Sequence, residues 1–177
     1  MLPELKLGIL VFTNQQSGAA FTSITNTIKD SYLGMKAIDR VKQNHDRVLQ
    51  NEAEAKKITG DIWKDIEARN NAAPKDIALF TGTYTDQWFG DIIISVKNGK
   101  LWFDSKRSWF LTGEMFPYKG NTFIVKWTER SMDADAFLRF DLDNNGRASH
   151  IKMNAISPLT DFSFDFQDLD FKRTEKK

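Results

Sequence analysis

The stretch at residues 157–173, SPLTDFSFDFQDLDFKR, limits the possible folds of this chain more than any other. From Phe162 to Phe166 its phenylalanines alternate with polar residues, which is the period-two pattern of a strand with one buried face. Leu169 and Phe171 continue the alternation one residue out of phase, so we predict a β-bulge between the two sets. A strand this aromatic needs a large apolar partner surface, which we expect the roughly 80 preceding residues to supply.

Those preceding residues repeat the period-two pattern from Ile77 onward, with turn signals at short intervals. The first predicted strand is 79–84, and the following ones contain the apolar alternations at 92–96, 101–103, 123–127, 136–142 and 149–155. Asn98-Gly99 is a strong hairpin signal. Short antiparallel strands without intervening helices predict a meander barrel or a sandwich. We favour the barrel, because closure leaves no long apolar edge exposed.

The first third of the chain is organised differently. Residues 5–13, LKLGILVFT, predict a short strand with both faces buried, because its apolar residues follow one another without alternation. A helix is predicted from about Gly18 to Leu33, where apolar residues recur at spacings of three and four. Residues 35–68 predict a charged helical connector with a thin apolar stripe, which Gly60 interrupts.

Composition excludes several classes of function. A hydrophobic content of 41% and a charged content of 28% are typical of a soluble globular protein. The net charge of +1 provides no attraction for nucleic acid. The absence of cysteine excludes disulfides, and no apolar run approaches the length of a membrane span. The opening MLPELKLGILVF lacks a basic leader and does not have the pattern of a signal peptide.

Two parts of the chain resemble known families. Residues 3–34, PELKLGILVFTNQQSGAAFTSITNTIKDSYLG, resemble the final strand and helix of a β-lactamase-like catalytic domain, the serine hydrolase superfamily that includes penicillin-binding proteins. The remainder resembles the lipocalin-like domain of unknown function that follows this catalytic domain in many bacterial proteins. That likeness rests on Gly82-Thr83-Tyr84, the run YTDQWFG at 84–90, Asp135-Ala136-Phe137 and the closing stretch 157–173.

The resemblance implies an organisation and a role. Residues 1–34 would be a catalytic-domain remnant, 35–74 a helical connector and 75–177 a lipocalin-like antiparallel β-barrel, so the fold is mainly β with N-terminal helices. The chain would be a truncated, noncatalytic accessory part of a bacterial hydrolase, shaping its active-site entrance or mediating assembly. Its partners would be the upstream catalytic domain and a second copy bound through residues 5–33, with no nucleic acid and no cofactor. The parent would be exported or periplasmic.

Three motifs are weighed against simpler interpretations. Ser149-His150-Ile151-Lys152 matches the Ser-x-x-Lys nucleophile motif of the superfamily, but it lies on a predicted strand, where residues three apart face opposite ways. We therefore assign no catalytic residue. Residues 141–146, DLDNNG, resemble the start of a calcium loop, but the twelfth position is Lys152, which favours a hairpin turn. Neither His45 nor His150 has a metal-ligand spacing, so no metal site is assigned.

An alternative function remains, a barrel that binds a lipid, a peptide or a cell-wall fragment. The candidate ligand-binding residues are Trp88, Trp102, Arg107, Trp109 and Trp127, which we expect near the barrel mouth. A pocket lined by these tryptophans would favour ligand binding, whereas a solid interior would favour the accessory role. The apolar segment 106–118 is poorly periodic, and we expect it to contact the catalytic domain or another subunit.

Overall fold

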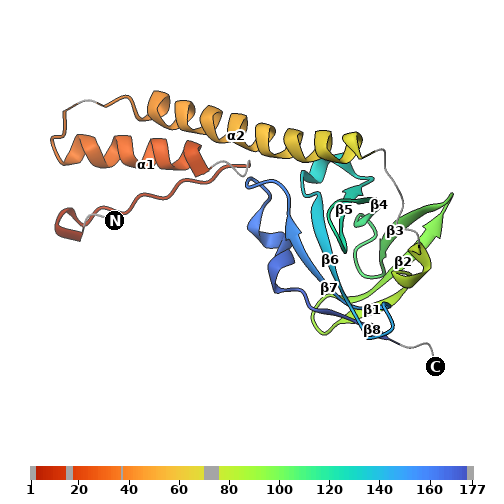
Figure 1. Cartoon of the computed structure of the whole chain (residues 1–177). Coiled ribbons are helices and arrows are strands. Elements are labelled where there is room, and N and C mark those ends of the chain that lie inside the picture. Colours follow the sequence, from red (N-terminus) through yellow and green to blue (C-terminus); the bar gives the residue numbers. More distant parts are fainter. Residues whose placement is uncertain (1–2, 15–17, 37, 70–75, 175–177) are drawn as a thin grey trace. The chain divides into compact units, whose positions relative to one another are not determined.

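The computed structural model of the chain describes residues 3–14, 18–36, 38–69 and 76–174 (Figure 1). The chain divides into two compact units, Met1–Glu54 and Ala55–Lys177. The long helix α2, Arg40–Ala68, contributes to both units.

The first unit contains the short 3₁₀ helix η1 (Pro3–Leu5), helix α1 (Gly18–Tyr32) and the beginning of α2. The helix predicted from Gly18 to Leu33 is confirmed as α1. Polar contacts join the two helices inside this unit. Arg40 Nε lies 2.6 Å from Asp30 Oδ2, and the buried Asn44 donates from Nδ2 to the buried Ser23 hydroxyl at 2.8 Å.

The predicted strand at residues 5–13 does not form. Leu10 and Phe12 in this segment are 84% and 89% exposed. A strand needs a neighbour for its backbone N–H and C=O groups, and the described part of this unit supplies no second strand. An apolar run was therefore not sufficient to predict a paired β-strand here.

Helix α2 is continuous through Gly60, where the sequence predicted an interruption. Its C-terminal part belongs to the second unit and packs against the barrel there. Ile66 is 1% exposed and joins a small apolar cluster on the barrel wall, while the rings of Trp63 and Phe116 meet edge to face at 5.4 Å. Among the helices that the structure describes, none is long and apolar enough to cross a membrane.

The second unit is a closed antiparallel barrel of eight strands in sequence order, and β8 pairs back onto β1. The strands are β1 (Gly82–Asp86), β2 (Gly90–Lys97), β3 (Lys100–Ser105), β4 (Thr112–Pro117), β5 (Thr122–Trp127), β6 (Ala136–Leu142), β7 (Ala148–Ala155) and β8 (Phe171–Thr174). The predicted fold class, a mainly β chain with N-terminal helices and a closed barrel, is confirmed.

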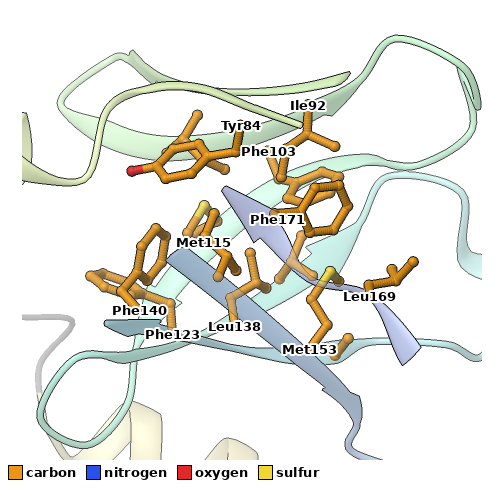
Figure 2. Packing of buried hydrophobic residues seen from close by; sticks show 14 of the residues in the cluster. Tyr84, Ile92, Phe103, Met115, Phe123, Leu138, Phe140, Met153, Leu169 and Phe171 are labelled. Carbon is orange, nitrogen blue, oxygen red and sulfur yellow. The ribbon is translucent and has the colours of Figure 1, made fainter. Parts of the chain in front are cut away.

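The barrel interior is filled by its own side chains. Alternate residues of each strand point inward, and Figure 2 shows Tyr84, Phe103, Phe140 and Phe171 converging there, each at most 2% exposed. Phe80 enters just before β1 and meets Phe140 edge to face at 5.1 Å. Aromatic packing of this kind stabilises a core beyond the apolar area that it buries.

The first strand begins three residues later than predicted, because Ile77–Leu79 forms the 3₁₀ helix η2. The Phe80 N–H donates to the Ile77 carbonyl at 3.2 Å, which keeps this segment coiled. The apolar residues of 77–80 therefore cover the barrel end instead of extending its wall.

The closing stretch was also predicted wrongly as one long strand. It forms two short 3₁₀ helices, η4 (Phe162–Phe164) and η5 (Phe166–Asp168), and only β8 is extended. The Asp161 side chain accepts the Ser163 N–H at 2.8 Å, and Asp165 adopts a left-handed conformation with φ of 47°. Aspartate side chains that bind nearby N–H groups compete with strand pairing. The alternation therefore marks two helical turns, and Phe162 is 83% exposed.

Strand β4 lies in the segment 106–118 that the sequence pattern left without regular structure. In β4 the inward position opposite Trp127 is Gly113, so the sequence of this strand lacks the alternation of apolar and polar residues that predicts a strand. A Cβ atom on Gly113 would lie 2.2 Å from the Lys126 carbonyl oxygen, so a larger residue does not fit.

Candidate functional site

The two ends of the barrel differ in their connections. Because successive strands are antiparallel, the loops 87–89, 106–111, 128–135 and 156–170 share one end, here called the long-loop end. The other end carries short turns, at 98–99, 118–121 and 143–147. Asn98 and Gly99 have φ values of 52° and 75°, as a two-residue hairpin turn with positive φ at both positions requires.

Exposed aromatic side chains occupy three loops of the long-loop end. Trp88 is 59% exposed, Trp109 75% and Phe162 83%. The Trp109 ring stacks on Phe110 with a centroid distance of 3.6 Å. Adjoining exposed apolar side chains mark sites of interaction, and Trp109 and Phe110 form such a pair.

A cleft of about 390 Å³ opens between these loops. Its apolar walls come from Trp88, Phe89, Phe110, Leu111, Met132 and Phe164, and its polar groups from Arg107, Ser108 and Ser163. The floor is continuous with the barrel core, since Phe89, Met132 and Phe164 pack against the buried cluster. The volume is in the range of small-molecule sites.

Asp86, at the end of β1, fixes one wall of the cleft. Its Oδ1 accepts the N–H groups of Trp88 and Phe89 at 2.8 and 2.7 Å, and its Oδ2 accepts the Asp170 N–H at 2.9 Å. Burial by itself would raise the pKa of Asp86, but these three backbone donors and Lys152 outweigh it, so the pKa lies below its usual value. One carboxylate thus joins the loops 87–89 and 156–170.

Arg107 connects two loops at the rim. Its Nη1 donates to the Trp88 carbonyl at 2.5 Å, which ties loop 106–111 to loop 87–89. The neighbouring Ser108 N–H donates to the Ser105 hydroxyl at 3.0 Å, which fixes the start of the same loop.

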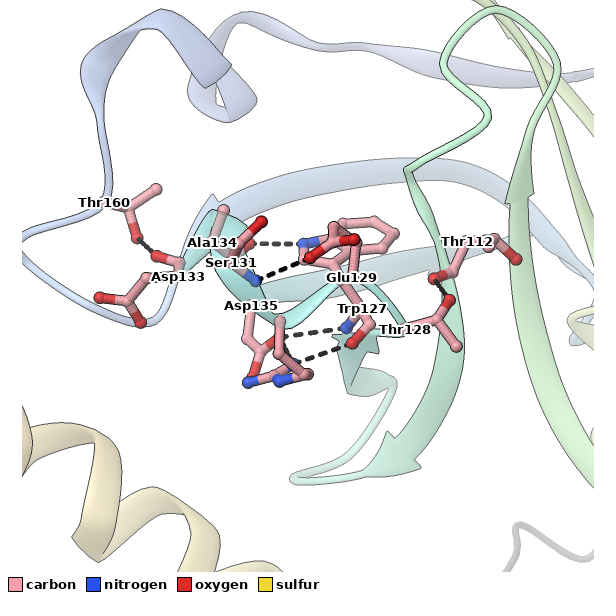
Figure 3. Close-up of polar contacts among 10 residues, drawn as sticks. Thr112, Trp127, Thr128, Glu129, Ser131, Asp133, Ala134, Asp135 and Thr160 are labelled. Atoms are coloured by element: carbon pink, nitrogen blue, oxygen red, sulfur yellow. Dashed lines mark hydrogen bonds and ion pairs between the residues drawn. The ribbon is translucent and has the colours of Figure 1, made fainter.

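Loop 128–135 is held by an ion pair and an indole (Figure 3). Arg130 Nη1 lies 2.6 Å from Oδ1 of the buried Asp135, and this bond raises the pKa of Arg130. Trp127 donates from Nε1 to the Ala134 carbonyl at 2.6 Å. These contacts fix the short helix η3 (Arg130–Met132), whose last residue lines the cleft.

The last loop is attached to this one. Thr160 Oγ1 donates to the Asp133 carbonyl at 3.1 Å, as Figure 3 shows. The capping bond from Ser163 N–H to Asp161 then positions Phe164 as the far wall. Every loop of the long-loop end is therefore bonded to a neighbouring loop or to its own strand.

The structure brings two of the five predicted ligand-binding residues together, Trp88 and Arg107. Trp109 lies beside the cleft on Phe110, whereas Trp127 is 1% exposed inside the barrel. Trp102 faces outward from β3, where Lys97 Nζ lies 4.8 Å from its ring centroid.

Sequence reasoning did not identify Met132 or Phe164 as residues that line the cleft. Met132 carries no local signal, because it stands in a short loop helix. Phe164 was assigned to a buried strand face. The preceding Asp161 is a residue type that caps helical turns by accepting a nearby backbone N–H, and this signal argued against a strand.

Ser149 and Lys152 bind different partners. The Ser149 hydroxyl donates to the Asp141 carbonyl at 3.1 Å and lies 3.0 Å from His150 Nδ1. Lys152 Nζ lies 3.0 Å from Asp170 Oδ1, and this hydrogen bond lowers the pKa of Asp170. A lysine held in this way is not placed to take a proton from the serine.

The 141–146 segment contains the last two residues of β6 and most of the hairpin turn at 143–147 that leads into β7. Oδ1 of Asp143 accepts the N–H groups of Asn145 and Arg147, both at 2.9 Å. Across residues 3–14, 18–36, 38–69 and 76–174, no group of three or more His, Asp or Glu side chains is placed to hold a metal ion.

Comparison with known proteins gives one match. Residues 67–173 match the model of a family described as Domain of unknown function (DUF3471). No curated protein and no solved structure matches the chain. The matched residues run from the end of α2 through the barrel to β8, so they include every loop of the cleft. The chain belongs to the DUF3471 family.

Proposed function

We propose that the barrel is a noncatalytic accessory domain of a bacterial β-lactamase-like serine hydrolase, where it shapes the active-site entrance or mediates assembly. The observation that supports this role most directly is the gathering of exposed aromatic residues at the long-loop end of a barrel whose interior is filled. Because side chains fill the barrel interior, a binding partner has to contact the outer surface of the barrel or its loops.

The stacked pair Trp109 and Phe110 is the centre of the proposed contact with the catalytic domain. Both side chains stand in the segment 106–118, and a partner that covers them removes two large apolar rings from water. Joint replacement of the pair by serine in the parent hydrolase should change its turnover or its thermal stability. A parent unaffected by the double change would count against this contact.

The assignment to a hydrolase parent rests on the resemblance of residues 3–34 and is tested by the open reading frame around Met1. We expect upstream Ser-x-x-Lys and Tyr-x-Asn elements and an export signal. A fluorescent penicillin should label that parent and leave the present chain unlabelled. A mass shift on Ser149 of this chain would overturn the noncatalytic assignment.

We also propose that a second copy covers residues 5–33. Leu10, Phe12, Phe21 and Ile24 in this range are all at least 46% exposed. Size-exclusion chromatography with light scattering should give a dimer for the chain, and Phe12→Ser should weaken it. A monomer at every concentration would contradict this proposal.

The cleft favours a second candidate function, the binding of a small ligand at the barrel mouth. The ligand would lie between loops, since the interior itself is occupied. Titration of the chain with small apolar compounds tests this role.

A further inference from the structure

We propose that the cleft of the long-loop end binds a small amphipathic carboxylate, with its apolar ring or short chain between the loops and its carboxylate on Arg107. This inference rests on the ligand-binding role proposed above and specifies the class of ligand.

The charge of the cleft selects an anion. Arg107 is its one charged side chain among the described lining residues, and no acidic residue is part of that lining. The other polar side chains there are the hydroxyls of Ser108 and Ser163. A ligand with one negative charge therefore complements the site, whereas an amine would be repelled by the guanidinium.

Arg107 retains donors for that ligand. A guanidinium has five N–H donors, and the hydrogen bond that the structure records for the Arg107 side chain uses Nη1, toward the Trp88 carbonyl. The edge formed by Nε and Nη2 is left for a bidentate carboxylate, which is the preferred geometry of this pair. The bond to Trp88 also holds the guanidinium in place before a ligand arrives.

The residues that line the cleft determine the size and the apolar character of the part of the ligand that carries no charge. Six of the nine lining residues are apolar, and Leu111 at the base is 7% exposed. A volume of about 390 Å³ accepts one aromatic ring with a short chain and is too small for a folded partner. The exposed rings of Trp88 and Phe110 at the rim suit a flat apolar group.

The cleft is largely formed in the absence of ligand. Asp86 holds Trp88 and Phe89 through their N–H groups, and the Arg130–Asp135 ion pair holds the helix that carries Met132. Preorganisation of this kind lowers the entropy lost on binding.

Calorimetric titration of the full chain with phenylbutyrate and with its neutral analogue phenylbutyramide tests the inference. At neutral pH and low salt we expect the acid to bind about fivefold more tightly than the amide. Arg107→Met should reduce the affinity for the acid to that for the amide, while Lys106→Met, which removes the adjacent exposed cation outside the lining, should retain the difference.

The outcomes separate this inference from the ligand-binding role. Equal affinity for acid and amide in the unchanged protein would overturn the carboxylate preference and leave an apolar ligand site. If Arg107→Met still binds the acid more tightly than the amide, a group other than Arg107 recognises the carboxylate, and this result also overturns the inference. Binding of neither compound at millimolar concentration would refute both. The acid–amide comparison needs no variant, so it decides the question even if Arg107→Met does not fold.

Discussion

Arg173 on the last strand donates from Nη2 to the phenolic oxygen of Tyr84 on the first strand at 2.5 Å, across the seam that closes the barrel. Its remaining donors reach the carbonyls of Leu79, Thr81 and Ala148, and its guanidinium lies 4.7 Å from the Tyr84 ring centroid. One side chain thus joins β8, β1, β7 and the segment that leads into the barrel.

The Tyr84 hydroxyl should make the barrel sensitive to alkali. It donates to the Phe80 carbonyl at 2.8 Å, and burial raises its pKa to about 12 against the effect of Arg173. A raised folded-state pKa gives stability that is complete below the unfolded value of 10.0 and is lost as the pH rises toward 12.

Tyr84→Phe should therefore cost about 1–2 kcal/mol near neutral pH and reduce the loss of stability between those two pH values. Urea denaturation across the range measures both effects. Tyr32→Phe, at an exposed tyrosine of the N-terminal unit, should keep the wild-type alkaline profile. An unchanged alkaline profile in Tyr84→Phe would refute the assignment.

Asp86→Asn should loosen the cleft and change the acid response. The new amide would place an N–H donor opposite one of the three backbone donors, at a cost of about 1–3 kcal/mol. Because the folded-state pKa is lowered, the stability that the carboxylate gives is present above 3.8 and lost as the pH falls below that value.

Acid titration of the free energy of unfolding should accordingly be shallower in Asp86→Asn than in the wild type. Asp168→Asn, at an exposed aspartate of the same loop, is the matched control and should keep the wild-type slope. Equal slopes in all three proteins would contradict the role given to Asp86.

Two glycine substitutions should act in opposite directions. Gly113→Ala places a Cβ atom 2.2 Å from the Lys126 carbonyl oxygen, so we expect a loss of about 1–3 kcal/mol. Gly60→Ala lies within α2 with no heavy atom within 4 Å of the added Cβ, and it should gain about 0.5–1 kcal/mol. Paired denaturation curves measure the difference, and a tolerated alanine at 113 would be inconsistent with the register of β4 and β5.

Substitutions of Trp127 and Trp109 should distinguish a tryptophan that stabilises the fold from one that serves a surface contact. Trp127→Leu removes a ring that is 1% exposed and leaves the Ala134 carbonyl without its indole donor, so we expect a loss of about 3–5 kcal/mol. Trp109→Ala removes a ring that is 75% exposed and should change stability by less than about 0.5 kcal/mol. Large destabilisation by Trp109→Ala would mean that this residue serves the fold and not a partner.

The barrel was predictable from the sequence because its strands bury one face each. Period-two patterns marked the interior positions of β2, β3, β5 and β6, and Asn98-Gly99 marked the turn between β2 and β3. The same rule failed where an interior position is a glycine, as in β4, and where aspartate side chains bind backbone N–H groups, as at Asp161.

The cleft was only half predictable. Trp88 and Arg107 were expected near the barrel mouth as an aromatic residue and a cation, but their proximity depends on loops from different hairpins. Met132 and Phe164 reach the site through 3₁₀ turns whose orientation is set by tertiary bonds, including the one from Thr160 to Asp133. Such contacts between residues far apart in the sequence cannot be predicted from local sequence patterns.

Strand β8 is four residues long, yet it supplies the neighbour for both β1 and β7. During synthesis on the ribosome, the edge of β1 that pairs with β8 stays unpaired until Arg173 has been made, 89 residues after Tyr84. During that interval two sheet edges are open to strands of other nascent chains. The domain should therefore depend on chaperones early in its life, and removal of its last few residues should send it to inclusion bodies while leaving most of its core sequence intact.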